Sequence, residues 1–295
     1  MKNKKPLVSI VMPVYNAGNF LLEAIESLQN QTYQNWELIM VDDRSTDNSW
    51  EILKNLTKED KRIKIYQVKK HCGVAFAANL ALKKVKGDLI ARMDADDISL
   101  PWRIEKQVKF LQNHPETIAL GGQCELINQE GETIGKKEFP LDNAKIKKMI
   151  FWSIPLQQPT LIVNRKLLPK NFKWYEKKFN VAEEVELLFK LFQYGEVFNL
   201  PETVLLYRIH GKNTSLQNPK RTFLLTFKTR IKAISKYSYQ PTISGFFLNL
   251  IQFFLIILLP NKWIFPIYSF LRGMKRVSLA VLPKPFLLQK RAQIS

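Results

Sequence analysis

The chain has 295 residues, of which 46% are hydrophobic and 24% charged, a globular composition. Its two cysteines exclude a disulfide framework and fit a reducing compartment. The formal net charge of +19 is uneven, because residues 203–295 hold 15 Lys or Arg and no Asp or Glu, whereas residues 1–202 hold 30 basic and 26 acidic residues. We therefore expect an ordinary folded body followed by a cationic segment that attracts nucleic acid or an anionic membrane.

Strands and helices alternate along the first hundred residues. A β-branched run at residues 7–12 ends in the turn signal "PVYNAG", and residues 19–33 carry apolar side chains at helical spacing. This alternation with short connections predicts an α/β fold built on a doubly wound, mostly parallel sheet. The further strands are expected at residues 36–41, 62–68 and 88–93, and the helix at residues 73–87 is expected to be closed by Gly87.

Polar side chains follow the first and second strands, at the edge where open α/β sheets bind ligands. In "VDDRSTD", Asp42 and Asp43 are placed where a carboxylate could accept hydrogen bonds from a base or from ribose hydroxyls. In "PVYN", the ring of Tyr15 could stack on a nucleobase. Helix capping by the aspartates and rim packing by the tyrosine are the structural alternatives, and the residues alone leave both open.

Three carboxylates follow the fourth strand, in "LIARMDADD". Asp94, Asp96 and Asp97 repel one another unless a cation neutralises them, and a hard divalent ion does so with oxygen ligands. The alternative is a solvated turn in which Asp97 begins the helix predicted in "LPWRIEKQVKFL". The apolar strand before the cluster and the second acidic strand end favour Mg²⁺ or Mn²⁺, held by one or two carboxylates and substrate phosphates.

The stretch "VSIVMPVYNAGNFLLEAIESLQNQTYQNWELIMVDDRSTDNSWEIL", followed later by "GDLIARMDADD", resembles the family 2 inverting glycosyltransferases of bacterial cell-surface polysaccharide synthesis. The likeness covers roughly residues 6–215 and implies the Rossmann-like GT-A fold. It also implies a nucleotide-sugar donor, commonly UDP-linked, and a divalent metal, Mn²⁺ or Mg²⁺. By this resemblance the metal ligands are Asp96, Asp94 and His210, and the nucleotide-sugar site contains Pro13, Tyr15, Asp42, Asp43, Asp94 and Arg208.

The same family has a late Glu-Asp motif whose second acid is the catalytic base. The matching stretch here is "VAEEVELLFKLFQYG", so the resemblance puts Glu184 at the base position with Glu183 before it. Spacing alone says less, because acidic residues in a first helical turn are ordinary helix-dipole chemistry. In the implied single displacement, Glu184 takes the proton of an acceptor hydroxyl while the nucleoside diphosphate leaves on the opposite face.

The chain departs from the family pattern at two places. In "HCGVAFAAN", His71 and Ala78 stand where the family often has Asn and Arg, while Gly73 and Asn79 remain. A contact to base or phosphate is therefore lost, or moved to Lys69, Lys70 or Arg92. At residues 157–160 the usual His-Pro-Thr reads "QQPT", which leaves the acceptor side open.

A boundary near residue 220 divides the chain into a glycosyltransferase domain, 1–220, and a basic, apolar helical extension, 221–295. In the extension, residues 243–259 form a 17-residue apolar stretch with a mildly polar stripe of Gly245, Asn249 and Gln252. A helix of that length spans about 26 Å, the lower limit for crossing a bilayer. We expect it to lie in the interface of an anionic membrane, on the cytoplasmic face; a spanning helix and a buried core helix are the alternatives.

Two other function classes compete with this hypothesis. A nucleotidyltransferase also uses a metal and an α/β sheet, but it should show a glycine-rich phosphate loop, and "PVYNAGNF" has one glycine and no lysine. The charge of +19 suggests a nucleic-acid- or membrane-binding protein without catalysis. Because the excess charge lies in an apolar tail, we expect lipid rather than nucleic acid as the partner, beside a glycan or lipid-linked acceptor.

Overall fold

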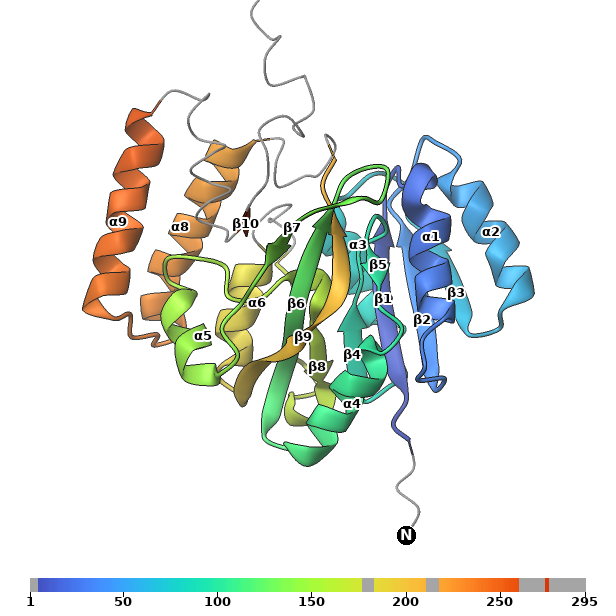
Figure 1. Ribbon diagram of the computed structural model, residues 1–295, viewed down its shortest axis with the longest axis horizontal. Helices are drawn as coiled ribbons and strands as arrows, with labels where there is room; N and C mark the ends of the chain where they lie inside the picture. The colour runs from blue at the N-terminus through green and yellow to red at the C-terminus, as the bar shows by residue number, and fades with distance from the viewer. Residues whose placement is uncertain (1–4, 177–182, 211–217, 260–273, 276–295) are drawn as a thin grey trace, which may run out of the picture.

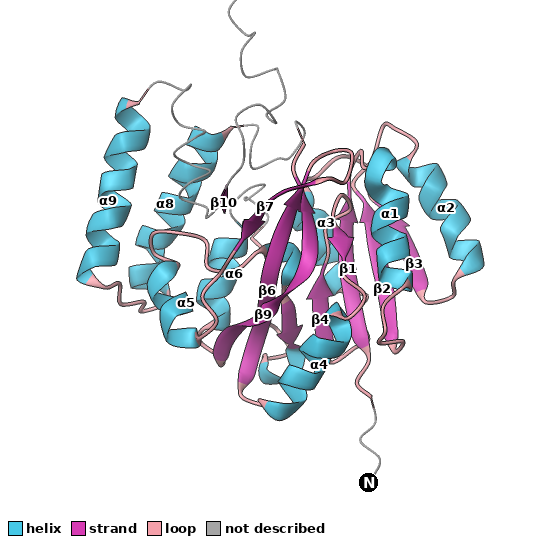
Figure 2. Ribbon diagram, viewed as in Figure 1, coloured by secondary structure: helices cyan, strands magenta, loops and turns pink. Residues whose placement is uncertain are grey.

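The computed structural model describes residues 5–176, 183–210, 218–259 and 274–275, and Figure 1 shows them as an α/β molecule with a pair of helices at one end. Figure 2 shows that one sheet runs through the body, with helices on both of its faces. The strands are β1 (Val8–Val14), β2 (Trp36–Asp42), β3 (Ile63–Gln67), β4 (Leu89–Arg92), β5 (Ile98–Ser99), β6 (Thr117–Ile127), β7 (Thr133–Lys137), β8 (Ile162–Asn164), β9 (Glu196–Arg208) and β10 (Met274–Lys275). The helices are α1 (Gly18–Gln29), α2 (Ser49–Glu59), α3 (Val74–Leu82), α4 (Arg103–Asn113), α5 (Asn143–Met149), α6 (Glu183–Leu191), α8 (Pro219–Lys236) and α9 (Ile243–Leu258), with short 3₁₀ turns at Gln158–Thr160 and Arg165–Leu167.

The sheet has the strand order β10-β7-β6-β8-β4-β1-β2-β3. Strands β4, β1, β2 and β3 are parallel neighbours, as the sequence predicts for its first four strands. Strand β8 is antiparallel to both β4 and β6, and the long β9 runs parallel to β6. The carboxyl ends of β4, β1 and β2 therefore lie side by side at one edge of the sheet.

Alternation along the strands explains why helices cover both faces. Ile10 packs with the apolar face of α1, whereas its neighbour Val11 packs with Ala77 and Ala81 of α3. Successive side chains of a strand point to opposite faces, so a fully apolar run needs a cover on each side. This is the doubly wound arrangement that the sequence indicates.

Helix α3 is shorter than the sequence predicts, because it ends at Leu82 and is not closed by Gly87. Gly87 instead passes close to β1: a Cβ atom there would lie 2.4 Å from the backbone oxygen of Leu7. Its N–H donates to the Ser9 hydroxyl at 2.8 Å. The glycine is therefore explained by the close approach of two backbones and not by a helix cap.

Strand β9 brings the end of the domain back to the acidic cluster. Its carboxyl-terminal part pairs antiparallel with β5, with Ile98 opposite Leu206. Since β5 directly follows the three aspartates, this pairing places Arg208 and His210 beside them. The family's late Arg-x-His segment and its Asp-x-Asp segment are thus joined by long-range strand pairing.

Helices α8 and α9 form the described part of the predicted extension, and α8 begins at Pro219, close to the expected boundary. The two helices pack against each other at the end of the molecule opposite α1 and α2 (Figure 1). Among the described helices, none is both long and apolar enough to cross a membrane. The predicted residues from Pro260 onward, with Trp263 and Tyr268, lie outside the described part apart from the short β10.

Candidate functional site

The candidate site lies along the carboxyl edge of β4, β1 and β2. Neighbouring strands are about 4.8 Å apart, so the ends of β2 and β4 are separated by about 10 Å. The sequence-predicted residues divide into two groups along this edge. Tyr15, Asp42 and Asp43 lie after β1 and β2, and the aspartate cluster lies after β4. Pro13 is buried within β1, beside Val41 of β2.

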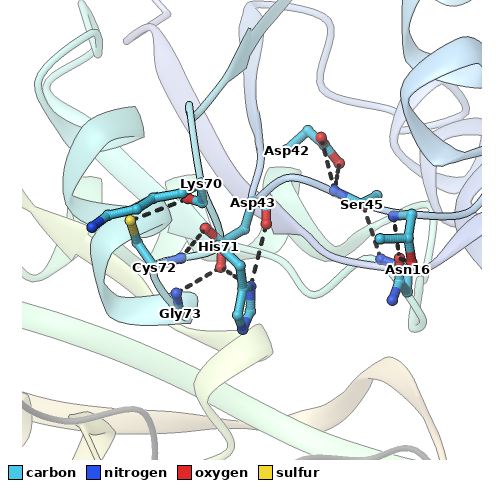
Figure 3. Close-up of polar contacts among 9 residues, drawn as sticks. Asn16, Asp42, Asp43, Ser45, Lys70, His71, Cys72 and Gly73 are labelled. Atoms are coloured by element: carbon cyan, nitrogen blue, oxygen red, sulfur yellow. Dashed lines mark hydrogen bonds and ion pairs between the residues drawn. The ribbon is translucent and has the colours of Figure 1, made fainter.

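Asp43 is the central residue of the first group (Figure 3). Its carboxylate is buried and accepts hydrogen bonds from the backbone N–H groups of Cys72, at 2.8 Å, and Gly73, at 2.6 Å. Gly73 precedes α3 with a φ of 93°, a left-handed conformation that glycine adopts without strain. The carboxylate therefore holds the loop before α3, and the retained Gly73 has a local structural reason.

Asp42 and the loop after β1 are tied into the same corner. The Asp42 carboxylate accepts from the Ser45 N–H at 3.2 Å and from Gln67 Nε2 at 2.9 Å. The Ser45 hydroxyl in turn accepts from the Asn16 N–H at 2.9 Å. The Gly18 N–H donates to the Asp47 carboxylate at 3.0 Å. Two loops that are far apart in sequence thus form one rigid rim.

Tyr15 and His71 form a stacked pair on this rim. Their ring centroids are 4.1 Å apart, and His71 Nδ1 lies 2.9 Å from an oxygen of Asp43. Tyr15 is 46% exposed, so its ring is available to a ligand. The histidine that replaces the family's usual Asn therefore bridges the two residues that the resemblance assigns to the base. Contacts of Tyr15, Asp42 and Asp43 with a nucleotide stay predictions.

The second group is the aspartate cluster. Asp94, Asp96 and Asp97 each offer an oxygen atom, and these atoms lie within 4.8 Å of one another. Asp94 pairs with Arg92 Nη2 at 2.8 Å, and Asp96 lies 2.8 Å from His210 Nε2. The three residues that the resemblance assigns to the metal, Asp94, Asp96 and His210, are thus together.

Asp97 does not begin a helix, contrary to the sequence-based expectation. It precedes β5, and α4 starts only at Arg103. Its buried carboxylate accepts the backbone N–H of Arg208 through one oxygen at 2.9 Å. Within the described part of the chain, its other oxygen is buried without a hydrogen-bond partner. Asp97 therefore joins β9 to the acidic cluster.

Arg208 is fully buried beneath the cluster. Its Nε donates to the backbone oxygen of Asp96 at 2.9 Å, and its Nη1 donates to the backbone oxygens of Asn128 and Gln129. Its Nη2 pairs with Glu23 of α1. These contacts make Arg208 a clamp between β9, α1 and the cluster, and its predicted approach to a diphosphate stays a prediction.

The carboxyl groups of the cluster are electrostatically unfavourable by themselves. Burial raises the pKa of Asp94, which Arg92 opposes and the carboxylates of Asp96 and Glu184 reinforce. Burial, together with Asp96 and Asp94, raises the pKa of Asp97 well above its ordinary value. Such shifts mean that the neighbouring cations do not fully balance the carboxylates.

The predicted catalytic acids lie at the first turn of α6, beside this cluster. Burial, reinforced by the charge of Glu184, raises the pKa of Glu183 to about 8. The influence of Glu184 on the pKa of Asp94 shows that α6 faces the same site. Asn79 holds the preceding segment, because its side chain exchanges two hydrogen bonds with the backbone of Tyr175, at 2.9 and 3.2 Å. The retained Asn79 therefore joins α3 to the segment at Tyr175.

Two buried arginines belong to the site, and only one of them drew attention in the sequence. Arg92, within β4, bonds Asp94, and the fully buried Arg103 donates to the backbone oxygen of Arg92 at 2.8 Å. A charged residue inside an otherwise apolar strand must find a partner, which is the signal at Arg92. Arg103 gives no such signal, because its position in an amphipathic helix reads as surface.

Comparisons with known proteins show the family to which the chain belongs. The model of glycosyl transferase family 2 matches residues 9–172. The chain is 33% identical over 255 residues to the O-antigen biosynthesis glycosyltransferase WbnJ of Escherichia coli, covering 84% of this chain and 95% of WbnJ. It is 32% identical over 258 residues to EpsE of Bacillus subtilis, which is named as a glycosyltransferase, covering 83% of this chain and 91% of EpsE.

Solved structures share the fold. S. aureus TarS 1–349 in complex with UDP superposes with a TM-score of 0.60 at 20% identity, covering 78% of this chain and 65% of that chain. The mannosyltransferase PcManGT from Pyrobaculum calidifontis, in complex with GDP-Man and Mn²⁺, gives 0.63 at 18% identity, covering 90% of this chain and 74% of that chain. These likenesses confirm the predicted α/β fold of the GT-A kind. Together with the family match over more than half of the chain, they lead to one conclusion: the chain belongs to glycosyl transferase family 2.

Proposed function

We propose that this glycosyltransferase transfers a sugar, with inversion, from a nucleotide-sugar donor, UDP-linked, to a hydroxyl group of a glycan or lipid-linked acceptor. The observation that carries the proposal is the convergence of Asp94, Asp96 and His210 with the first turn of α6. A divalent ion would balance the carboxylates of such a cluster and bind the diphosphate oxygens of the donor at the same time. The UDP complex of TarS and the GDP-Man complex of PcManGT support a donor of this class.

The residues present fit a hard divalent cation. The cluster offers three carboxylates, and burial raises the pKa of two of them, Asp94 and Asp97. One buried oxygen of Asp97 has no partner among the described residues. Asp96, Asp94 and His210 would hold Mg²⁺ or Mn²⁺, and a bound ion would act as a Lewis acid on the departing phosphate. The Mn²⁺ in the PcManGT complex supports this cofactor.

The rim of Tyr15, His71 and Asp43 would hold the nucleoside. Tyr15 presents an aromatic face for stacking, and the adjoining His71 adds a second ring and hydrogen-bonding nitrogens. The base end would lie after β2 and the diphosphate end after β4, in keeping with the separation of about 10 Å between those strand ends.

In the proposed reaction, Glu184 accepts the proton of the acceptor hydroxyl. The hydroxyl oxygen forms a bond with the anomeric carbon while the bond from that carbon to the phosphate oxygen breaks. The electron pair leaves with the nucleoside diphosphate on the opposite face, which inverts the anomeric configuration. Burial raises the pKa of Glu183 to about 8, which keeps it protonated at neutral pH, so we assign the role of base to Glu184.

We further propose that the acceptor belongs to cell-surface polysaccharide synthesis and that the enzyme works at the cytoplasmic face of the membrane. The name of WbnJ, an O-antigen biosynthesis enzyme, supports the first part. The cationic residues after Glu202 support the second, because Lys and Arg are enriched on the cytoplasmic side of membranes.

The proposal is tested with a panel of UDP- and GDP-linked sugars, with and without Mg²⁺ or Mn²⁺. We expect one donor to raise the melting temperature only when metal is present, because bound ligand stabilises the folded state by mass action. With that donor, nuclear magnetic resonance of the product should show the anomeric configuration opposite to that of the donor. Retention of configuration, or no metal-dependent stabilisation by any donor, would contradict the proposal.

A further inference from the structure

Helix α9 buries two polar side chains together with Ile256 against the protein and leaves an apolar stripe exposed on its opposite side. Asn249 and Gln252 are buried, at 0% and 5% exposure, against the rest of the molecule. Along the opposite side runs an exposed stripe at spacings of three and four residues, which we call the outer face of α9. Its members are Ile243, Phe247, Ile251, Phe254 and Leu258, all more than half exposed.

The inward side of α9 meets a polar surface of α8. Arg230 donates to the side-chain oxygen of Asn249 at 3.1 Å and to the backbone oxygen of Ile150 at 2.8 Å. Buried threonines lie on the same side of α8, at positions 222, 226 and 229. Because the buried polar contacts fix the rotation of α9, the apolar outer face is a built feature of the fold. A surface helix in water has the opposite polarity.

Cations accompany this apolar surface. An open hollow of about 480 Å³ lies along the first turns of α8, lined by Lys220, Arg221, Lys228 and the apolar Leu224 and Leu225. Figure 1 shows that α8 begins at the same edge of the molecule as the carboxyl ends of β1 and β2. Helices α8 and α9 contain no Asp or Glu, so no acidic residue of their own competes for these cations.

We propose that the outer face of α9 and the basic hollow of α8 dock together on an anionic lipid bilayer. Phenylalanine and aliphatic side chains would enter the boundary between headgroups and acyl chains, while the three cations would meet lipid phosphates. The 16 residues of α9 give a length of about 24 Å, suited to lying along the surface. A second copy is a poorer occupant, because its own α8 and α9 contain no Asp or Glu and would offer the three cations no anionic partner.

This docking goes beyond the proposed transfer reaction and can be tested without a substrate. The full chain is mixed with vesicles of phosphatidylcholine, with or without one third phosphatidylglycerol, and separated by flotation at low and high salt. We expect binding to the anionic vesicles alone, weakened by salt because the headgroup attraction is screened. The absence of binding to the anionic vesicles would overturn the proposal.

Variants separate the two contributions. Phe247→Gln with Phe254→Gln should weaken binding to anionic vesicles about tenfold or more, because two large apolar side chains no longer leave water. Lys220→Ser, Arg221→Ser and Lys228→Ser together should weaken it on the order of 100-fold. The matched control is Leu22→Gln on α1, an equally exposed apolar residue at the other end of the molecule, and should bind like the parent.

Circular dichroism and melting curves establish that each variant is folded before its binding is compared. A phenylalanine variant that is folded and binds vesicles like the parent would overturn the proposal. It would also be overturned if light scattering showed a dimer that the phenylalanine changes dissociate while the parent failed to bind vesicles, because a second copy would then occupy the face.

Discussion

Helices α1 and α9 stand at opposite ends of the molecule and divide their residues in opposite ways (Figure 1). Helix α1 buries Leu21, Ile25 and Leu28 against the sheet and leaves polar residues outside. Helix α9 buries Asn249 and Gln252 beside Ile256 and leaves Phe247 and Phe254 exposed. The exposed surface of α1 is therefore typical of a helix in water, whereas that of α9 is apolar.

A parallel difference in charge separates the catalytic edge from the extension. At the edge, carboxylates outnumber the cations that meet them, and pKa values are raised. In the extension, Lys and Arg occur without any acidic residue of its own. By our proposals, a divalent cation would balance the charge of the first region and an anionic bilayer that of the second. The lesson is that unbalanced charge in a well-folded chain points to what the chain binds.

The largest effect is expected when the proposed catalytic base is removed. Glu184→Gln should lower the transfer rate by about 10²–10⁴-fold, because proton removal from the acceptor is lost, and should leave donor affinity close to that of the parent. Single-turnover assays with saturating donor measure the first quantity and calorimetry the second.

A residue two positions away on α6 supplies the matched control. Glu186 faces the extension, where its carboxylate accepts from the hydroxyl of Tyr237 at 2.7 Å and from Lys236 Nζ at 2.9 Å. Glu186→Gln should therefore lower the melting temperature while the rate stays near that of the parent. If Glu184→Gln kept full turnover, the assignment of the base would be wrong.

Removing a proposed metal ligand should have the next largest effect. Asp96→Asn should lower the rate by about 10²–10³-fold, because charge on the departing phosphate loses its counterion, and should abolish stabilisation by Mn²⁺. The control is Asp88→Asn before β4, where the carboxylate makes a surface ion pair with Lys166 at 3.0 Å. That change should alter neither quantity. Metal-dependent melting that survives in Asp96→Asn would contradict the proposed ligand.

The charge imbalance at the catalytic edge can be tested through the pH dependence of folding stability. The pKa of Glu183 is raised to about 8 in the folded state, against about 4.3 in an unfolded chain. Between these values the unfolded state releases a proton that the folded state keeps, so the stability of the parent falls as pH rises toward 8.

Glu183→Gln lacks this titration, so its melting temperature relative to the parent should increase by several degrees between pH 5 and pH 8. The comparison is made in a chelator, so that no metal changes the balance. A difference that stays constant over this range would mean that Glu183 ionises normally in the folded chain.

The smallest expected effect concerns the stacked rings of Tyr15 and His71, at the end of the site that we propose holds the nucleobase. His71→Ala should weaken UDP binding about three- to tenfold, because one ring beside Tyr15 is removed. His114 provides the control, since it is also stacked on an aromatic residue, Phe110, with centroids 4.4 Å apart, but lies outside the carboxyl edge. His114→Ala should leave UDP affinity unchanged in calorimetry. If the two changes had equal effects on UDP affinity, His71 would not belong to the nucleotide site.

The sequence by itself determines much of the catalytic half. Short apolar, β-branched runs and helical spacing locate β1 to β4 and the helices between them, because these patterns follow local backbone geometry. Asp42, Asp43 and Asp94 are placed at strand ends by adjacency alone. The resemblance adds roles for these residues that geometry could not supply.

Only the tertiary structure decides the contacts between distant segments. The pairing of β5 with β9 brings Arg208 to Asp97, and the packing of α8 turns the apolar stripe of α9 outward. A local pattern records which side chains share a face but not what that face meets. That choice depends on which surfaces are brought together when the chain folds. At α9 it leaves the apolar stripe exposed, because Arg230 of α8 holds the side-chain oxygen of Asn249 inside.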